Sequence, residues 1–213
     1  MQTHTLQDET YATLRQWITV GQFLPGERLK IRDVAQAMGV GVMPVRAALL
    51  RLAAEGALTH SANRGVCVPQ LSKAEFDDVL QMRLLLEGEA AERGALRLPQ
   101  SEHAHLQDLS TKMQEALAQH QAKAYLDANE AFHLILYRAA GSPTLLALIE
   151  TVWLKVGPLS NQLFADMAQV HHLNDAHSDS LQALRKGDPA GVRRAIEKDL
   201  FVAGQMLRRH CVG

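Results

Sequence analysis

Residues 29–68 read LKIRDVAQAMGVGVMPVRAALLRLAAEGALTHSANRGVCV. At the start of this segment, Val34, Ala35 and Met38 can share one buried side of a short amphipathic helix. Gly39-Val40-Gly41 then interrupts the helical pattern, because two glycines so close together suit a tight turn with unusual backbone angles. The segment therefore begins with a short helix and a glycine turn.

A second helix follows the glycine turn. Pro44 falls in its first turn, where a missing backbone N–H is tolerated. Its apolar positions repeat at i, i+4 and i+7, and they are Val45, Leu49 and Leu52. Arg46 and Arg51 lie off this stripe. A helix, a short turn and a second helix are typical of the helix-turn-helix motif, in which the second helix enters the major groove of DNA.

The residues after the second helix predict a small β-hairpin. Residues 57–60 are extended, residues 61–65 are turn formers and residues 66–68 are β-prone. We expect Arg64 and Gly65 near the tip of this hairpin, which would form a wing beside the two helices.

The motifs RDVAQAMGV, PVRAALLRLAAEGAL and NRGVCV resemble the winged helix of the GntR family of bacterial transcription regulators. That family typically reads L-x-x-LA-x-x-x-GVSRTPVREAL-x-RL-x-x-EGL-x-x-x-x-x-RGxxV. The resemblance implies a partner of double-stranded DNA, with contacts from six residues: Arg32, Pro44, Arg46, Arg51, Arg64 and Gly65.

The segment departs from the family pattern just before the proline. The family's Ser-Arg pair is Gly41-Val42 here. Replacing a serine helix cap by glycine costs only a few tenths of a kcal/mol. The missing arginine removes a base or phosphate contact, so we expect this position to affect both the operator sequence and the affinity for it.

The charge of the chain is uneven along its length. The 213 residues carry a net charge of −1, but residues 1–70 carry +2 and the remaining residues carry −3. Between Arg28 and Arg64 the balance is +4. A protein that coats nucleic acid without regard to sequence is usually more basic, so this distribution favours specific recognition by a dimer.

Composition is that of an ordinary globular protein. Hydrophobic residues make up 47% of the chain, and abundant Ala and Leu with few aromatic residues favour helix. No apolar run approaches the length of a membrane span, and the first residues lack the pattern of a secretory signal. Cys67 and Cys211 are too few for a disulfide framework or a thiolate zinc site. We therefore expect a reduced, cytoplasmic protein with no membrane partner.

We expect two domains, at residues 1–70 and 71–213. After a first helix from Leu6 to Val20 and the winged segment, Ser72 and Glu75 form a capping box that opens a long helix to about Arg97. Further helices are expected at about residues 100–119, 121–140, 143–156, 158–170, 172–186 and 188–210. The predicted fold class is mainly α: an N-terminal winged helix-turn-helix followed by an all-α helical bundle.

Polar side chains interrupt the apolar stripes of these later helices. Arg83 lies among apolar residues of the long helix, and Asn129 and His133 project together at i, i+4 from another. His177 and Asp199 fall on inward faces of the last two helices. Buried charges and imidazoles are unfavourable unless they are paired or bind a metal. Their co-occurrence predicts a polar pocket inside the bundle.

Each of these residues also has a purely structural explanation. A buried histidine is often hydrogen-bonded to a backbone carbonyl. Arg83 can pair with Glu87 one turn on, and Asp199 can pair with Arg194. The pocket hypothesis therefore depends on all of the polar residues together.

Three segments of the second domain resemble the FCD effector domain of the FadR-type branch of GntR regulators: MRLLLEGEAAERGA at 82–95, NEAFHLILYRAAGSPTL at 129–145 and HSDSLQALRKGDPAG at 177–191. The resemblance implies four ligands for a divalent metal, Asn129, His133, His177 and Asp199, with Asp199 in place of a histidine. Such a set can bind Zn²⁺, Ni²⁺ or Mn²⁺, although fewer imidazoles and a neutral amide weaken the affinity. A pocket without metal is the alternative. The resemblance also implies that Arg83 offers a two-pronged donor to a carboxylate effector.

The whole sequence predicts a homodimeric, ligand-responsive transcription regulator that reads a palindromic operator. By analogy with most relatives, we expect a repressor that a small organic acid releases from DNA. A DNA-binding dimer without sensing is an alternative, because Val42 and Asp199 depart from the family pattern. A metal-dependent enzyme is a weaker one, since no general base, HExxH or nucleophile elbow accompanies the polar cluster. An enzyme is therefore not expected.

Overall fold

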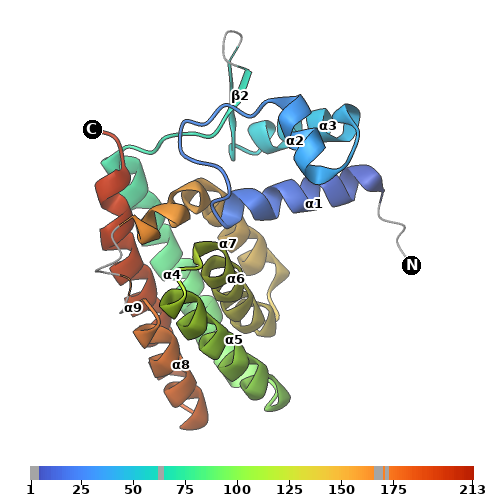
Figure 1. The fold of residues 1–213 in the computed structure, drawn as a ribbon. Coiled ribbons are helices and arrows are strands. Elements are labelled where there is room, and N and C mark those ends of the chain that lie inside the picture. Colours follow the sequence, from blue (N-terminus) through green and yellow to red (C-terminus); the bar gives the residue numbers. More distant parts are fainter. Residues whose placement is uncertain (1–4, 62–64, 166–169, 171–172) are drawn as a thin grey trace.

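The computed structural model describes residues 5–61, 65–165, 170 and 173–213. The chain is mainly helical, with a small N-terminal unit above a bundle of longer helices (Figure 1). In chain order, the described elements are α1 (Leu6–Thr19), α2 (Ile31–Met38), α3 (Val42–Ala54), β1 (Thr59–Ser61), β2 (Gly65–Cys67), α4 (Lys73–Arg97), α5 (Ser101–Ala118), α6 (Ala122–Ala139), α7 (Pro143–Val156), the 3₁₀ helix η1 (Gly157–Phe164), α8 (Asp175–Arg185), α9 (Pro189–Leu207) and the 3₁₀ helix η3 (Arg208–His210). Among these described residues, no single helix has the length and apolar character to cross a membrane, and only the bent pair α2–α3 passes that test jointly.

Helices α2 and α3 form the predicted helix-turn-helix. The first ends at Gly39, whose φ of 67° is left-handed and therefore suits glycine. Gly41 then precedes α3 in an extended conformation, without a side chain to cap the helix. The predicted apolar stripe is confirmed, because Val45, Leu49 and Leu52 are fully buried.

Strands β1 and β2 form the predicted hairpin. They are antiparallel, and Thr59 pairs with Cys67 while Ser61 pairs with Gly65. A bridge from Arg28 to Cys67 places the segment before α2 along the hairpin. The hairpin projects away from the bundle on the side of α2 and α3 (Figure 1).

The long helix α4 organises the bundle. It begins with the predicted capping box, in which Ser72 and Glu75 each accept a hydrogen bond from the other's backbone N–H. It packs against α6, α7 and α9. Gly94 lets α4 approach α6 closely, because a Cβ at this position would overlap the carbonyl group of Leu136. This close approach brings the polar residues of α4 next to those of α6.

The helix predicted at residues 158–170 is of a different type. Residues 157–164 form the 3₁₀ helix η1, and α8 begins at Asp175 rather than at residue 172. Pro158 lacks an N–H for an α-helical hydrogen bond, and the Gly157 backbone packs against carbonyl oxygens of α1. We attribute the tighter helix to these two constraints. The predicted helical residues 166–169, 171 and 172 lie outside the described residues.

Two hydrophobic cores correspond to the two parts of the chain. One is built by α1, α2, α3 and the hairpin, and the other by the helices from α4 onward. The cores exchange residues, since Leu154 of α7 packs into the first and Val20 packs into the second. A 2.9 Å ion pair between Arg15 and Glu150 crosses the same boundary. The N-terminal unit is therefore attached to the bundle through α1 and α7.

Candidate nucleic-acid interface and buried metal centre

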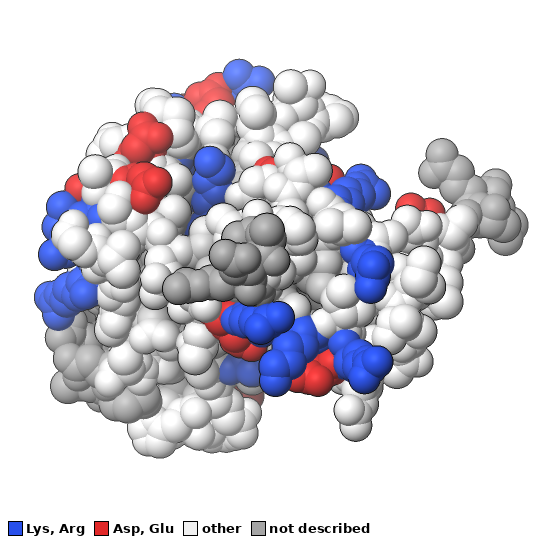
Figure 2. All heavy atoms as spheres, turned by 90° about the horizontal axis from the view of Figure 1, so that it is seen from above, with Lys and Arg blue, Asp and Glu red and all other residues white. Residues whose placement is uncertain are grey.

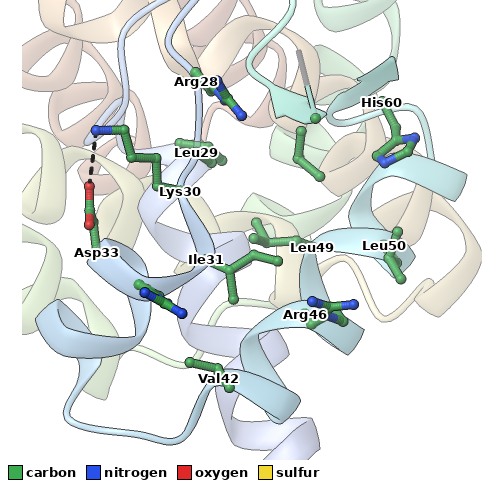
Figure 3. A pocket seen from close by; sticks show the side chains of 13 residues that line it. Arg28, Leu29, Lys30, Ile31, Asp33, Val42, Arg46, Leu49, Leu50 and His60 are labelled. Atoms are coloured by element: carbon green, nitrogen blue, oxygen red, sulfur yellow. Dashed lines mark ion pairs between the residues drawn. The ribbon is translucent and has the colours of Figure 1, made fainter. Parts of the chain in front are cut away.

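A groove of about 600 Å³ lies between α2, α3 and the hairpin. Val42, Arg46 and Leu50 follow one another along α3 and line the groove (Figure 3). The basic lining residues are Arg28, Lys30, Arg32 and Arg46, and the hairpin adds His60 and Gly65. The groove thus combines the second helix of the helix-turn-helix with most of the basic residues of the segment.

The basic side chains of this groove are available to a ligand. Within the described part of the chain, Arg32 and Arg46 form no ion pair, and Lys30 has only an exposed pair with Asp33 at 3.7 Å. Figure 2 looks onto the face from which the hairpin projects, and it shows Lys and Arg side chains around that face with some Asp and Glu between them. Unpaired cations around an open groove can contact the phosphates of a nucleic acid.

Arg51 does not line the groove. Its guanidinium stacks over the ring of Tyr11 on α1, with its central carbon 3.8 Å from the ring centroid. Its Nε donates a hydrogen bond of 3.0 Å to Glu55. These two contacts hold Arg51 against the N-terminal unit itself.

Of the six residues predicted to contact DNA, the structure brings Arg32, Arg46 and Gly65 together at the groove. Pro44 is half-buried in the first turn of α3. Arg64 lies outside the described residues.

Inside the bundle, three of the four predicted metal ligands converge. His133 comes from α6, His177 from α8 and Asp199 from α9. Nε2 of His133 lies 3.3 Å from Nε2 of His177 and 3.4 Å from Oδ2 of Asp199. The two histidines are buried, and only 11% of the Asp199 side chain is exposed. The bundle therefore gathers two imidazoles and a carboxylate from three different helices.

A hydrogen-bonded chain determines which nitrogen of His133 faces this cluster. Tyr137, one turn further along α6, donates its hydroxyl proton to Oε2 of Glu87 over 2.9 Å. Burial, together with the nearby Glu87, keeps the pKa of Tyr137 well above its usual value, so this proton is retained. The hydroxyl oxygen can then accept from Nδ1 of His133, which lies 2.7 Å away. We assign the His133 proton to Nδ1, which leaves a lone pair on Nε2.

Arg83 forms the outer end of the same chain. Its Nε donates to Oε1 of Glu87 at 2.6 Å, and its Nη2 donates to Oε2 at 3.3 Å. The Glu87 side chain is fully buried, whereas 16% of the Arg83 side chain is exposed. Burial opposes the charge of Arg83, but Glu87 outweighs it and raises the Arg83 pKa above its usual value. Glu87 thus occupies Nε and one N–H of Nη2, and within the described residues the other N–H groups of the guanidinium make no further hydrogen bond.

The charges of the cluster suit a cation. Burial lowers the pKa of His177 to about 4 despite the opposing effect of Asp199, so this imidazole is neutral at neutral pH. Burial by itself would raise the pKa of Asp199, but the two imidazoles and Arg83 lower it below its usual value. Nδ1 of His177 is 3.9 Å from Oδ1 of Asp199, which is too far for a hydrogen bond. The lone pair assigned to Nε2 of His133 and the ionised carboxylate of Asp199 therefore face one another.

These residues fit a divalent metal. In a tetrahedral zinc site with bonds of about 2.0–2.1 Å, neighbouring ligand atoms are about 3.3–3.4 Å apart. The two shortest distances between side chains of the cluster, 3.3 Å and 3.4 Å, match this spacing. The Tyr137 hydroxyl supplies the outer hydrogen bond that ligating histidines usually have.

A cavity of about 50 Å³ adjoins the cluster. Asn129, the fourth predicted ligand, lines it together with His133 and Arg83. The end of α1 and the start of η1 close the cavity with Thr19, Val20, Gly157 and Ser160. A water molecule takes up about 30 Å³ in the liquid, so this cavity admits an organic acid only if its walls move.

Tyr137 was not predicted from the sequence. Its i, i+4 spacing from His133 is a local signal that could have identified the first contact. The hydrogen bond from Tyr137 to Glu87 joins residues 50 positions apart, and it depends on the packing of α4 against α6. No local pattern indicates that second contact.

Comparisons with known proteins match both parts of the chain. Residues 6–68 match the model of the bacterial regulatory proteins of the gntR family, and residues 78–200 match the FCD domain. The HTH-type transcriptional regulator McbR of Escherichia coli K12 is 30% identical over 195 residues, which cover 90% of this chain and 87% of McbR. The HTH-type transcriptional repressor RspR of the same strain is 25% identical over 207 residues, which cover 97% of this chain and 91% of RspR.

Solved structures show the same relationship. The structure of E. coli McbR/YncC has a TM-score of 0.90 and 26% identity, and the match covers 97% of this chain and 99% of that one. A GntR transcriptional regulator from Rhodococcus sp. RHA1 shares the fold, with a TM-score of 0.74 and 22% identity over 94% of this chain and 96% of that chain. The matched families and relatives are transcriptional regulators, not enzymes. The chain is therefore a DNA-binding transcription regulator of the GntR family, with an FCD domain after its winged helix.

Proposed function

We propose that this regulator binds a palindromic operator as a cytoplasmic homodimer and represses transcription until a small carboxylate binds in its helical domain. Two winged helices related by a two-fold axis would read two equivalent half-sites. The groove lined by Arg32, Arg46 and Gly65 supports this role, because neither arginine forms an ion pair within the described residues. The relative RspR is named a repressor, which favours repression by analogy.

We infer that a divalent metal, Zn²⁺, Ni²⁺ or Mn²⁺, is held by His133, His177 and Asp199, with Asn129 as the fourth ligand. The observation that carries this inference is the 3.4 Å approach of Nε2 of His133 to the Asp199 carboxylate, with the His133 proton assigned to Nδ1. Two acceptors this close repel each other unless a proton or a metal cation lies between them, and in the assigned tautomer of His133 no proton does. A bound metal supplies a Lewis acid that a carboxylate ligand can coordinate.

The size of the cavity supports a link between ligand binding and the winged helix. At about 50 Å³, the cavity accepts an organic acid only if its walls separate. In that wall, Thr19 is the last residue of α1 and Val20 follows it, and α1 also builds the core of the N-terminal unit. A ligand in contact with Arg83 would therefore shift α1 and with it the winged helix. It acts by the difference in its affinity for the two arrangements.

The experiment begins with the full-length protein and an operator duplex selected from random sequences. Operator affinity is measured by fluorescence anisotropy with Zn²⁺ and with acetate, lactate, succinate or citrate. We expect at least one of these acids to weaken operator binding in the metal-loaded protein. Arg83→Lys keeps a positive charge beside Glu87 but loses the N–H groups proposed to bind the acid. This variant should therefore respond less to the acid, while its operator affinity in the absence of acid stays unchanged. A metal-loaded protein whose operator affinity no acid changes would reject sensing.

A DNA-binding dimer without sensing is the second candidate. Glu87 occupies one fork of Arg83, and the cavity beside it is small. In this function, the chain from Arg83 to His133 is a structural polar core. Protein that contains no metal as purified, and whose operator affinity ignores both Zn²⁺ and the four acids, would favour this candidate.

A further inference from the structure

We propose that Val42 and Met43, in the first turn of α3, read thymine methyl groups in the major groove beside the base contacted by Arg46. The proposal depends only on the DNA-binding role of the winged helix. It is independent of metal and effector binding in the bundle.

The first evidence is the exposure of apolar side chains on α3. Val42 is 47% exposed, Met43 is 70% exposed and Leu50 is 49% exposed. The buried side of the same helix is already complete, with Val45, Leu49 and Leu52 in the core. The packing of the N-terminal unit therefore does not account for the three exposed side chains. Clustered exposed apolar groups commonly mark a surface that binds a partner.

The second evidence is the arrangement of these side chains around Arg46. Val42, Arg46 and Leu50 follow one another along the groove-lining side of α3 (Figure 3). Met43 lies three residues before Arg46, so the two project from neighbouring positions on the helix. The exposed surface of α3 at the groove is thus apolar on both sides of a single guanidinium.

Charge identifies the occupant as duplex DNA rather than another protein. Arg28 and Arg32 line the same groove, and Lys30 is beside them. These cations complement two phosphate backbones, whereas an apolar protein partner would leave them desolvated and unpaired. The apolar side chains therefore face a polyanion, and they must contact an apolar group that it carries.

Base chemistry supplies that apolar group. In the major groove, the thymine C5-methyl is the apolar feature that distinguishes a base pair. The side chains of Val42 and Met43 carry no hydrogen-bond donor with which to read guanine or phosphate. The first turn of the second helix is the part that reaches base edges in helix-turn-helix proteins. We therefore expect α3 to combine one arginine contact, suited to guanine, with adjacent thymines.

The test uses the full-length protein and its preferred duplex, selected from a random pool. Each thymine of that duplex is replaced in turn by deoxyuridine, which keeps the hydrogen-bonding groups and lacks the methyl group. We expect one or two replacements per half-site to weaken binding about fourfold each, the effect of one buried methyl-sized group. Replacements elsewhere in the duplex should leave affinity unchanged.

Two variants locate the effect on α3. Val42→Ser and Met43→Ser should each remove the deoxyuridine sensitivity of one position, so that thymine and deoxyuridine duplexes bind equally. Leu96→Ser, at a position on α4 that is also 70% exposed, should retain the full wild-type sensitivity. The proposal is overturned if no thymine replacement weakens binding of the wild type. It is equally overturned if both α3 variants keep the wild-type sensitivity, since the methyl groups would then be read elsewhere.

Discussion

The hydroxyl oxygen of Tyr137 lies 2.7 Å from Nδ1 of His133, one turn away on α6. The same hydroxyl donates to Glu87, which pairs with Arg83. A single tyrosine therefore connects the residue proposed to contact the effector with a residue proposed to hold the metal.

Tyr137→Phe should weaken metal binding about 10- to 100-fold, the usual effect of losing an outer hydrogen bond to a ligating histidine. Removal of the hydroxyl leaves the His133 ring without its orienting acceptor. Titration with Zn²⁺ followed by calorimetry measures the change. Tyr11→Phe, which loses a hydroxyl bonded to Glu55 in the N-terminal unit, is the matched control. Equal Zn²⁺ affinity of the two variants would remove Tyr137 from the metal site.

His133→Ala should lower the metal content of the purified protein, measured by elemental analysis, because it removes the ligand atom closest to both His177 and Asp199. In the wild type, Zn²⁺ at 100 times its dissociation constant should raise the free energy of unfolding by about 2.7 kcal/mol. Chelation should abolish that gain. His105→Ala, at an exposed position on α5, should retain both metal and stabilisation. An unchanged metal content in the His133 variant would contradict its assignment as a ligand.

Arg83→Ala should reduce the free energy of unfolding by about 3–5 kcal/mol, because it leaves the fully buried carboxylate of Glu87 without its positively charged partner. The double variant Arg83→Met with Glu87→Gln should recover much of this loss, since the introduced amide carries no charge and its oxygen can still accept from Tyr137. Chemical denaturation measures both values. If Arg83→Ala is as stable as the wild type, the ion pair between Arg83 and Glu87 does not stabilise the bundle.

Arg46→Ala should weaken specific operator binding by about 1–3 kcal/mol, the usual effect of losing an arginine that contacts a base edge. Arg51→Ala should affect it less, because Arg51 is held by Tyr11 and Glu55 outside the groove. Gel shifts with the operator duplex and with a duplex of random sequence distinguish the loss of base recognition from a loss of affinity for any DNA. A larger effect at Arg51 than at Arg46 would mean that Arg51 leaves Tyr11 when DNA binds.

Gly157→Ala should destabilise the contact between the two parts of the chain. A Cβ there would lie 2.5 Å from the carbonyl oxygen of Ile18 and 2.6 Å from that of Thr19. Overpacking of this kind costs about 1–3 kcal/mol. Hydrogen exchange should become faster at the amides of Val20 and Gly21, which bond to carbonyls at the end of α1. Exchange rates equal to those of the wild type would show that α1 does not depend on this contact.

Local sequence patterns predicted much of the fold. The spacing of Val45, Leu49 and Leu52 predicted the buried side of α3, and Ser72 with Glu75 predicted the start of α4. The helix start depends on hydrogen bonds between residues three positions apart, and the buried side of α3 depends on the spacing of apolar residues along one helix. The sequence therefore contains them directly.

The buried cluster was predicted in part. His133, His177 and Asp199 were predicted from inward positions and from the resemblance to FCD domains, and the structure brings them together. Asn129 adjoins this cluster at the small cavity. The spacing of Arg83 and Glu87 predicted that they pair. It did not predict which N–H groups of Arg83 the pair leaves for a ligand. That assignment requires the geometry of the bound fork.

The amino-acid order predicted the winged helix-turn-helix, the long helices and the inward-facing polar positions. Each of these features follows from the spacing of residues within a single helix or turn. Three other contacts emerged from the folded chain: Arg51 stacks on Tyr11 of α1, Tyr137 bonds to Glu87, and Gly157 packs against the end of α1. Each of these contacts joins residues that are distant in the chain. The packing of whole helices creates such contacts, and no periodicity within one helix specifies them.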